Sequence, residues 1–271
     1  MKRLFKFFAA LALGALALGA CGKEEPEDTD PVNLLDLLYP NGQEVRGRTI
    51  QSTAMKQTMK YNVWLPPGFD EKKTYPFLYL LHGAGDNQDA WLSTEVSYGM
   101  PSGGNAAAIA ARYVKNGGTP MIIVMPDAQL TFYSGNFETY FHEELMPEVE
   151  SAYKFSGKRA IAGLSMGGYG TLYHALKYPE KFTYGYAMSP AVADWFTTLI
   201  DAQSSKSVFP PFTIEVGTED TTVNNADAEA LANYMKDNGL QCEWIARAGI
   251  HYWTFWQECL PKALQKVGET F

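Results

Sequence analysis

The sequence predicts an α/β fold in which helices cover both faces of a mostly parallel central sheet of about eight strands. Short, continuous apolar runs such as Phe77–Leu81 and Met121–Met125 are typical of strands that are buried on both faces. Stretches with helical periodicity alternate with these runs along the chain. No internal repeat or change in composition interrupts residues 41–271, which are therefore expected to form one domain.

The strands are expected, in chain order, at Arg46–Ser52, Lys60–Leu65, Phe77–Leu81, Met121–Met125, Arg159–Ala162, Tyr184–Met188, Phe212–Val216 and Glu243–Ala246. The helices that alternate with them are expected at Ala106–Lys115, Glu143–Tyr153, Gly167–Lys177, Ala226–Asn238 and Trp256–Lys266. A short helical turn at Leu34–Leu38 precedes this domain.

The N-terminus has the pattern of an export signal. Basic residues at positions 2, 3 and 6 precede the apolar run Phe7–Ala20, which is shorter than the ~20 residues of a membrane span. The run ends in Leu18–Cys21, which resembles a bacterial lipobox, so we expect residues 1–20 to be removed and Cys21 to be lipidated. An ordinary cleaved signal is the alternative. The expected product is an exported lipoprotein on the outer membrane, facing the periplasm or the cell surface, whose lipid anchor is its one membrane contact.

Residues 21–40 contain the charged stretch Lys23–Pro31 and are expected to form a flexible tether.

The net charge and the number of cysteines exclude some classes of protein. A net charge of -8 argues against a nucleic-acid partner, because binding to phosphates needs a basic face. Three cysteines are too few for a disulfide scaffold, although Cys242 and Cys259 could form one bridge or remain free. The sequence leaves the oligomeric state open.

The strongest local motif is Gly163-Leu164-Ser165-Met166-Gly167, between an expected strand and an expected helix. This context is typical of a nucleophile elbow, a tight turn that exposes a serine above the sheet of an α/β-hydrolase. The serine needs a general base, and in this fold the triad follows the chain order serine, acid, histidine. That order excludes His82 and His142. His174 is too far along the nucleophile's own helix, so His251 is the expected base.

Asp220 is the expected acid, because it follows the strand Phe212–Val216 closely. The main alternative acid is Asp194, and Glu219, the residue before Asp220, is a second alternative. The backbone N–H of Met166, at a helix N-terminus, is expected to stabilise the developing oxyanion. Ala84, in the glycine-containing loop that follows Phe77–Leu81, is expected to supply the second N–H.

These motifs resemble the esterase D-like esterases of the α/β-hydrolase superfamily, especially the family-1 carbohydrate esterases. The resemblance covers residues 45–270 and rests on the following segments: Tyr61–Gly68, Leu80–Gly83, Trp91, Glu144–Pro147, Gly163–Gly168, Gly217–Asp220, His251, Trp253 and Trp256. It implies the same triad of Ser165, Asp220 and His251, and the same oxyanion hole. Ile250-His251-Tyr252 departs from the Gly-His-Asp that relatives often carry, and this adds bulk beside the base.

The residues predict a serine esterase that needs no cofactor and no metal. The resemblance, whose family includes feruloyl and acetylxylan esterases, implies that it releases feruloyl or acetyl groups from xylan-type carbohydrates. Trp91 and Trp253 are expected to bind the substrate by stacking, together with Phe132, Tyr133, Trp195 and Phe196. Two alternatives remain open. One is a siderophore-type esterase that cleaves a catechol ester or lactone, and the other is a catalytically silent surface protein that binds glycans.

Overall fold

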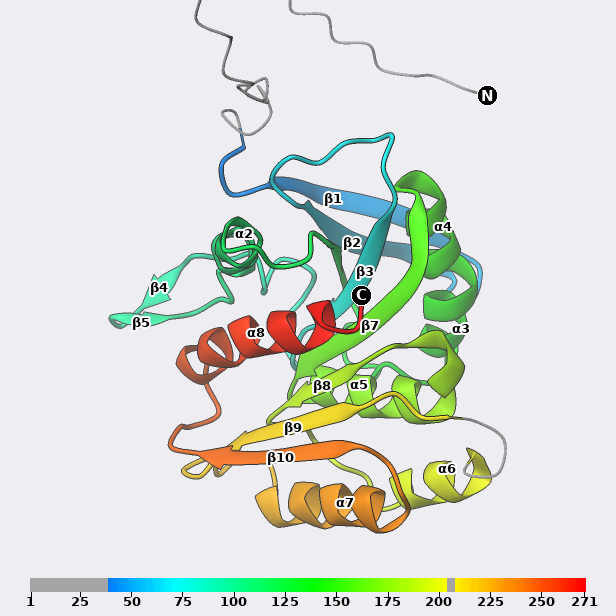
Figure 1. Cartoon of the computed structure of the whole chain (residues 1–271), viewed down its shortest axis with the longest axis vertical. Helices are drawn as coiled ribbons and strands as arrows, with labels where there is room; N and C mark the ends of the chain where they lie inside the picture. The colour runs from blue at the N-terminus through cyan, green and yellow to red at the C-terminus, as the bar shows by residue number, and fades with distance from the viewer. Residues whose placement is uncertain (1–38, 204–207) are drawn as a thin grey trace, which may run out of the picture. The chain divides into compact units, whose positions relative to one another are not determined.

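The computed structural model describes residues 39–203 and 208–271, and its main feature is an eight-stranded sheet (Figure 1). All eight predicted strands are confirmed. They are β1 (Gln43–Ser52), β2 (Gln57–Leu65), β3 (Tyr75–Leu81), β6 (Ile122–Pro126), β7 (Phe155–Leu164), β8 (Gly185–Met188), β9 (Phe212–Gly217) and β10 (Cys242–Arg247). Their order across the sheet is β1-β2-β6-β3-β7-β8-β9-β10. Strand β2 pairs antiparallel with β1 and β6, and every other pair is parallel.

The two faces of the sheet carry separate hydrophobic cores. Along β3, Phe77, Tyr79 and Leu81 belong to one core, whereas Leu78 and Leu80 belong to the other. This alternation follows from the two-residue period of a strand and explains why the segment is apolar throughout. Helices α2 (Ala106–Lys115) and α8 (Trp253–Gly268) pack together over the second core. The first core is covered by α4 (Met146–Ala152), α5 (Met166–Lys177), α6 (Phe196–Gln203) and α7 (Asn225–Asp237).

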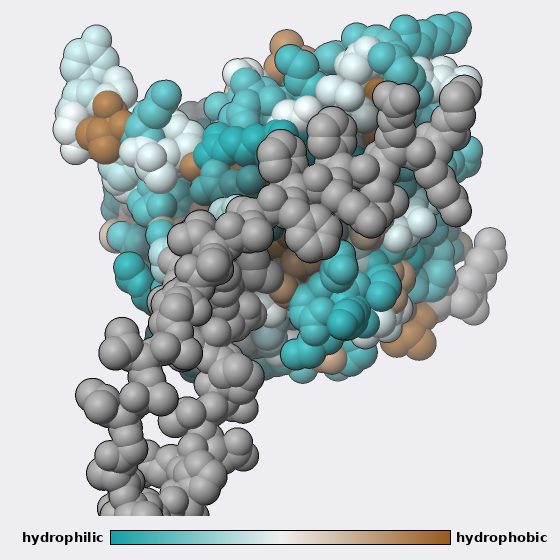
Figure 2. Space-filling view, turned by 90° about the horizontal axis from the view of Figure 1, so that it is seen from above, coloured by the Kyte–Doolittle hydropathy of each residue, from teal (hydrophilic) through white to brown (hydrophobic). Residues whose placement is uncertain are grey.

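The sequence-based prediction differs from the structure at several short elements. The single helix expected at Glu143–Tyr153 is the end of a longer run made of α3 (Asn136–Thr139), the π-helix η1 (Tyr140–Leu145) and α4. Helix α6, the short 3-10 helix η2 (Pro179–Lys181) and a hairpin of β4 (Val96–Ser97) and β5 (Met100–Pro101) were not predicted. The hairpin projects from the domain (Figures 1 and 2), and its apolar side chains are exposed, so no burial pattern marks it in the sequence.

The predicted signal peptide, Cys21, the turn at Leu34–Leu38 and all of the tether before residue 39 lie outside the described residues. Within residues 39–203 and 208–271, no helix has the length and apolar character that a membrane span requires. Cys242 and Cys259 are free thiols. Burial raises the pKa of the Cys242 thiol to about 12, which keeps it protonated at neutral pH.

Candidate active site

Ser165 occupies a strained turn between β7 and α5. Its φ of 54° and ψ of −115° place a residue with a side chain where glycine is favoured. The turn is fixed by three backbone hydrogen bonds: Ser165 N–H donates to Met188 O, and the N–H groups of Tyr169 and Ala191 donate to Ser165 O. Strain held in this way is typical of functional sites, and the conformation is the one expected for a nucleophile elbow.

Two glycines make this turn possible. A Cβ at Gly163 would lie 2.5 Å from Gly167 O, and a Cβ at Gly167 would lie 2.3 Å from Leu81 O. Both distances are far below van der Waals contact, and the atoms that would be struck belong to the backbone. Only glycine therefore allows β7, α5 and the end of β3 to approach so closely.

His251 is paired with Asp220. Its Nδ1 lies 2.6 Å from Asp220 Oδ2, and the Asp220 side chain is fully buried. The other carboxylate oxygen of Asp220 accepts hydrogen bonds from the N–H groups of Thr222 and Val223. The ring of Trp256 packs edge-on against the imidazole, with 4.9 Å between ring centroids. A carboxylate acceptor at Nδ1 favours the tautomer whose Nε2 is free to accept a proton.

Sheet topology brings the three predicted triad residues to one edge. Ser165 directly follows β7, Asp220 follows β9 and His251 follows β10. Strands β7, β8, β9 and β10 are adjacent and parallel, so their carboxyl ends lie along the same edge of the sheet. Ligands of open α/β sheets bind outside these ends. Asp194 follows β8 at this edge, and its side chain is exposed.

Glu219, the other alternative acid, joins the loops that carry Asp220 and His251. Its N–H donates to Gly249 O at 3.0 Å, while its carboxylate accepts a hydrogen bond from Gly249 N–H. The hydrogen bond from Gly249 N–H, together with one from the Thr218 hydroxyl at 3.0 Å, holds the pKa of the Glu219 carboxyl below its usual value. The sequence did not reveal this arrangement, because Glu219 and Gly249 lie in different loops.

The loop after β3 lies beside the nucleophile. A Cβ at Gly83 would lie 3.6 Å from Ser165 Cβ. His82 fixes the next peptide group: Ala128 N–H donates to its Nε2, so Nδ1 carries the proton and donates to Gly83 O at 2.7 Å. Burial lowers the pKa of His82, in keeping with this neutral form. Gly83 C=O and Ala84 N–H belong to the same trans peptide group and therefore point in opposite directions. The hydrogen bond from His82 to Gly83 O thus also fixes the direction of Ala84 N–H.

The second predicted oxyanion donor is Met166, the first residue of α5. The N–H of a first helical residue has no partner inside its helix and lies at the positive end of the helix dipole. Met166 directly follows Ser165 in the chain, and Ala84 directly follows Gly83, which lies beside Ser165.

The aromatic side chains differ from the prediction. Trp91 and Trp253 are only 1% and 6% exposed and pack edge-on against each other, with 5.2 Å between ring centroids. Trp91 also donates through its indole N–H to Leu81 O. Tyr133 and Phe196 are buried as well. Their burial contradicts the expected stacking role, because these rings belong to the two hydrophobic cores of the domain.

Two of the predicted aromatics, Phe132 and Trp195, are well exposed, and both contact Tyr169. Tyr169 lies one helical turn after Ser165, and side chains of a helix lean toward its N-terminus, here toward the nucleophile. These three rings form what we call the aromatic platform. Tyr169 was missed from the sequence, although its spacing of one turn from the serine would have indicated it.

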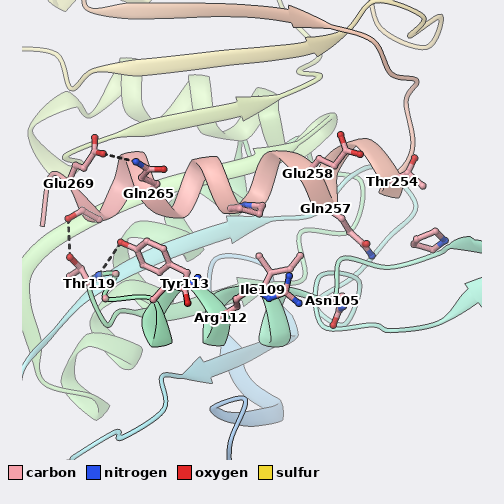
Figure 3. A pocket seen from close by; sticks show the side chains of 16 residues that line it. Asn105, Ile109, Arg112, Tyr113, Thr119, Thr254, Gln257, Glu258, Gln265 and Glu269 are labelled. Carbon is pink, nitrogen blue, oxygen red and sulfur yellow. Dashed lines mark hydrogen bonds between the residues drawn. The ribbon is translucent and has the colours of Figure 1, made fainter.

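A groove of about 960 Å³ lies elsewhere, between α2 and α8 (Figure 3). Its walls include Ile109, Arg112 and Tyr113 from α2 and Gln257 from α8, but none of the predicted triad residues. A smaller pocket adjoins the loop after β3. In the part of the chain that the structure describes, no three His, Cys, Asp or Glu side chains are grouped in a way that could hold a metal ion.

Comparisons with known proteins identify the family of this chain. The Esterase family model matches residues 52–267, which is most of the chain. The chain belongs to the Esterase family. Its domain is therefore an esterase domain with the α/β-hydrolase fold.

Individual relatives of this chain include proteins named for xylan-related substrates, and the chain spans only about a third or less of the length of most of them. It is 29% identical over 237 residues to an endo-1,4-β-xylanase/feruloyl esterase of Xylanibacter ruminicola, covering 80% of this chain but 30% of that protein. It is 25% identical over 234 residues to an acetyl esterase of Caldicellulosiruptor saccharolyticus, covering 69% of this chain and 81% of that enzyme. A solved ferulic acid esterase superposes with a TM-score of 0.74 at 25% identity, covering 85% of this chain and all of that one.

Proposed function

We propose that this protein is a serine carboxylic-ester hydrolase that uses Ser165 as nucleophile, His251 as general base and Asp220 as the acid that orients the base. The observation that carries the proposal is the buried hydrogen bond between His251 Nδ1 and Asp220 Oδ2, at the same edge of the sheet as the strained Ser165. Membership of the Esterase family supports the reaction class.

The reaction would proceed in two acyl-transfer steps. Ser165 Oγ attacks the ester carbonyl carbon while His251 Nε2 takes the hydroxyl proton, and the carbonyl oxygen becomes an oxyanion held by the N–H groups of Ala84 and Met166. The intermediate then collapses, and the alcohol leaves with the proton from His251. Water, activated by the same histidine, hydrolyses the acyl-enzyme and restores Ser165. Asp220 stays ionised and stabilises the imidazolium in both steps.

For the substrate, we propose feruloyl or acetyl esters of xylan-type carbohydrates. The names of the relatives support this class, since they include a feruloyl esterase and an acetyl esterase. The aromatic platform of Phe132, Tyr169 and Trp195 supports the feruloyl ester in particular, because partly exposed rings beside the nucleophile can stack on an aromatic acyl group.

Hydrolysis of methyl ferulate and of an aryl acetate by the full-length protein tests this function. Wild type should hydrolyse one or both, and Ser165→Ala should lose about a thousandfold or more of that activity. A fluorophosphonate probe should label wild type at Ser165 and leave the variant unlabelled. Absence of labelling and of turnover in folded wild type would refute the serine mechanism and favour the glycan-binding alternative. Turnover of catechol esters alone would point to the siderophore-type esterase.

We also propose export as a lipoprotein anchored through Cys21, on the basis of the N-terminal sequence pattern. Labelling cells with a radioactive fatty acid should mark the wild-type chain and spare Cys21→Ala. Equal labelling of the two chains, or labelling of neither, would refute the anchor.

A further inference from the structure

A polar pocket of about 530 Å³ opens beside the loop that follows β3. Its walls come from residues 85–87, 89–90 and 93–95, with Arg46 and Ser102. Among the described residues that line it, no aromatic or large aliphatic side chain occurs. Its chemistry therefore differs from that of the aromatic platform on α5 and its neighbouring loops.

The pocket reaches toward the nucleophile through Asp86. Asp86 Oδ2 and Ser165 Cβ both lie 3.6 Å from the position that a Cβ at Gly83 would occupy. Asp86 Oδ2 and Ser165 Cβ are therefore separated by no more than twice 3.6 Å. A group bonded to the alcohol oxygen of an ester held at Ser165 would be within reach of this carboxylate.

Some of the polar groups in the pocket are already used by the fold. Asp89 accepts hydrogen bonds from Asn62 and Gln88, both at 2.7 Å. Arg46 donates to Glu44 at 2.7 Å and to Leu92 O at 3.1 Å. Because Asp89 and Arg46 already have partners in the fold, they shape the wall of the pocket, and little of the arginine's charge is left for an anionic ligand.

Other polar groups in the pocket are available to a ligand. In residues 39–203 and 208–271, no side-chain hydrogen bond is made by Asp86, Thr94, Glu95 or Ser102. Two carboxylates and two hydroxyls offer mainly acceptors, which suit a neutral ligand that is rich in hydroxyl donors. A negatively charged ligand would be repelled by the same carboxylates.

We propose that this pocket binds the sugar that forms the alcohol part of the ester, and that Asp86 accepts a hydrogen bond from one of its hydroxyls. The inference rests on the proposed function and extends it, by assigning the acyl group to the aromatic platform and the sugar to the polar pocket. Burial raises the pKa of the Asp86 carboxyl, so its ionised form is poorly solvated and gains from a hydroxyl donor.

The test compares two esters of the same acid on the full-length protein: a feruloylated arabinoxylo-oligosaccharide and methyl ferulate, or the corresponding acetyl pair. Asp86→Asn keeps the size of the side chain but weakens it as an acceptor. It should lower kcat/KM for the sugar ester by about 10- to 100-fold, mainly through KM, and change kcat/KM for the methyl ester less than threefold. Asp237→Asn, the same chemical change at an exposed site on α7, should alter neither value. Circular dichroism and Tm confirm that each variant is folded.

The outcomes separate the two proposals. An equal effect of Asp86→Asn on both esters, or no effect on either, would overturn the sugar pocket while leaving the esterase function intact. Hydrolysis of the methyl ester without any hydrolysis of the sugar ester by wild type would do the same. If wild type hydrolyses neither ester with either acyl group, the proposed function itself fails.

Discussion

Glu219 and Gly249 exchange two hydrogen bonds, one from each backbone N–H, and so join the loop of Asp220 to the loop of His251. A Cβ at Gly217 would lie 2.3 Å from Gly249 O, which shows how closely the two loops approach. The link is placed one residue before the proposed acid and two residues before the proposed base. It therefore joins, close to the His251–Asp220 hydrogen bond, the two loops that carry this pair.

We expect Glu219→Ala to lower activity by disturbing the position of His251. Loss of the carboxylate leaves Gly249 N–H without its acceptor and loosens the loop of His251, so kcat should fall about 10-fold or more with KM nearly unchanged. Glu219→Gln keeps an acceptor oxygen and should recover most of the rate. Steady-state kinetics with methyl ferulate or an aryl acetate measures both. Equal losses in the two variants, or a change confined to KM, would contradict the positioning role.

Asp220→Asn should lower kcat by about 10⁴-fold with little change in Tm. The amide can keep contact with His251 but favours the wrong imidazole tautomer and no longer stabilises the imidazolium. Asp194→Asn is the matched control, because Asp194 is exposed and follows the neighbouring strand β8. Its kcat should stay within twofold of wild type. A large loss in Asp194→Asn, with Asp220→Asn remaining active, would reverse the assignment of the acid.

Ser165→Gly should produce an inactive protein that is more stable than Ser165→Ala. Both variants lack the hydroxyl, but only glycine relaxes at a φ of 54° and a ψ of −115°. The difference in the free energy of unfolding is expected to be about 1 kcal/mol, or roughly 2–4 °C in Tm. Calorimetry on the two variants side by side measures it. Identical Tm values would show that the elbow holds no appreciable strain.

The buried histidines should make stability depend on pH. Lys181 Nζ donates to His142 Nδ1, so His142 Nε2–H donates to His174 Nδ1 at 3.0 Å. Burial, together with neighbouring positive charge, lowers the pKa of His142 to about 2, and burial lowers the pKa of His174 to about 3. In the unfolded chain both titrate near pH 6.5, so below this pH the unfolded state binds protons that the folded state does not.

Stability is therefore expected to fall as the pH drops from 6.5 to 5, by about 1.4 kcal/mol per pH unit for each buried histidine once the unfolded form is fully protonated. His174→Gln removes one such group and should make the fall shallower by about that slope. Urea unfolding at several pH values measures it. A variant whose free energy of unfolding depends on pH as steeply as that of wild type would show that His174 takes up its proton in the folded state.

Local patterns in the sequence determined much of this protein. The eight strands, the strand-to-helix context of Ser165 and the position of His251 were predicted, because each depends on a short run of residues. A strand buried on both faces must be apolar along its length, and a tight turn between β7 and α5 needs glycine at fixed places. These requirements concern residues that are consecutive in the chain, so they can be recognised without knowledge of the rest of the fold.

Only the tertiary structure decided which distant residues meet. Asp220, Asp194 and Glu219 all remained candidate partners of His251 in the sequence, and the packing of the β9 and β10 loops selects Asp220 for the hydrogen bond. The burial of Trp91 and Trp253 was also decided by the tertiary structure, because the exposure of a ring depends on every segment that packs around it. Contacts of this kind join residues that are far apart in the chain, and no local pattern encodes them.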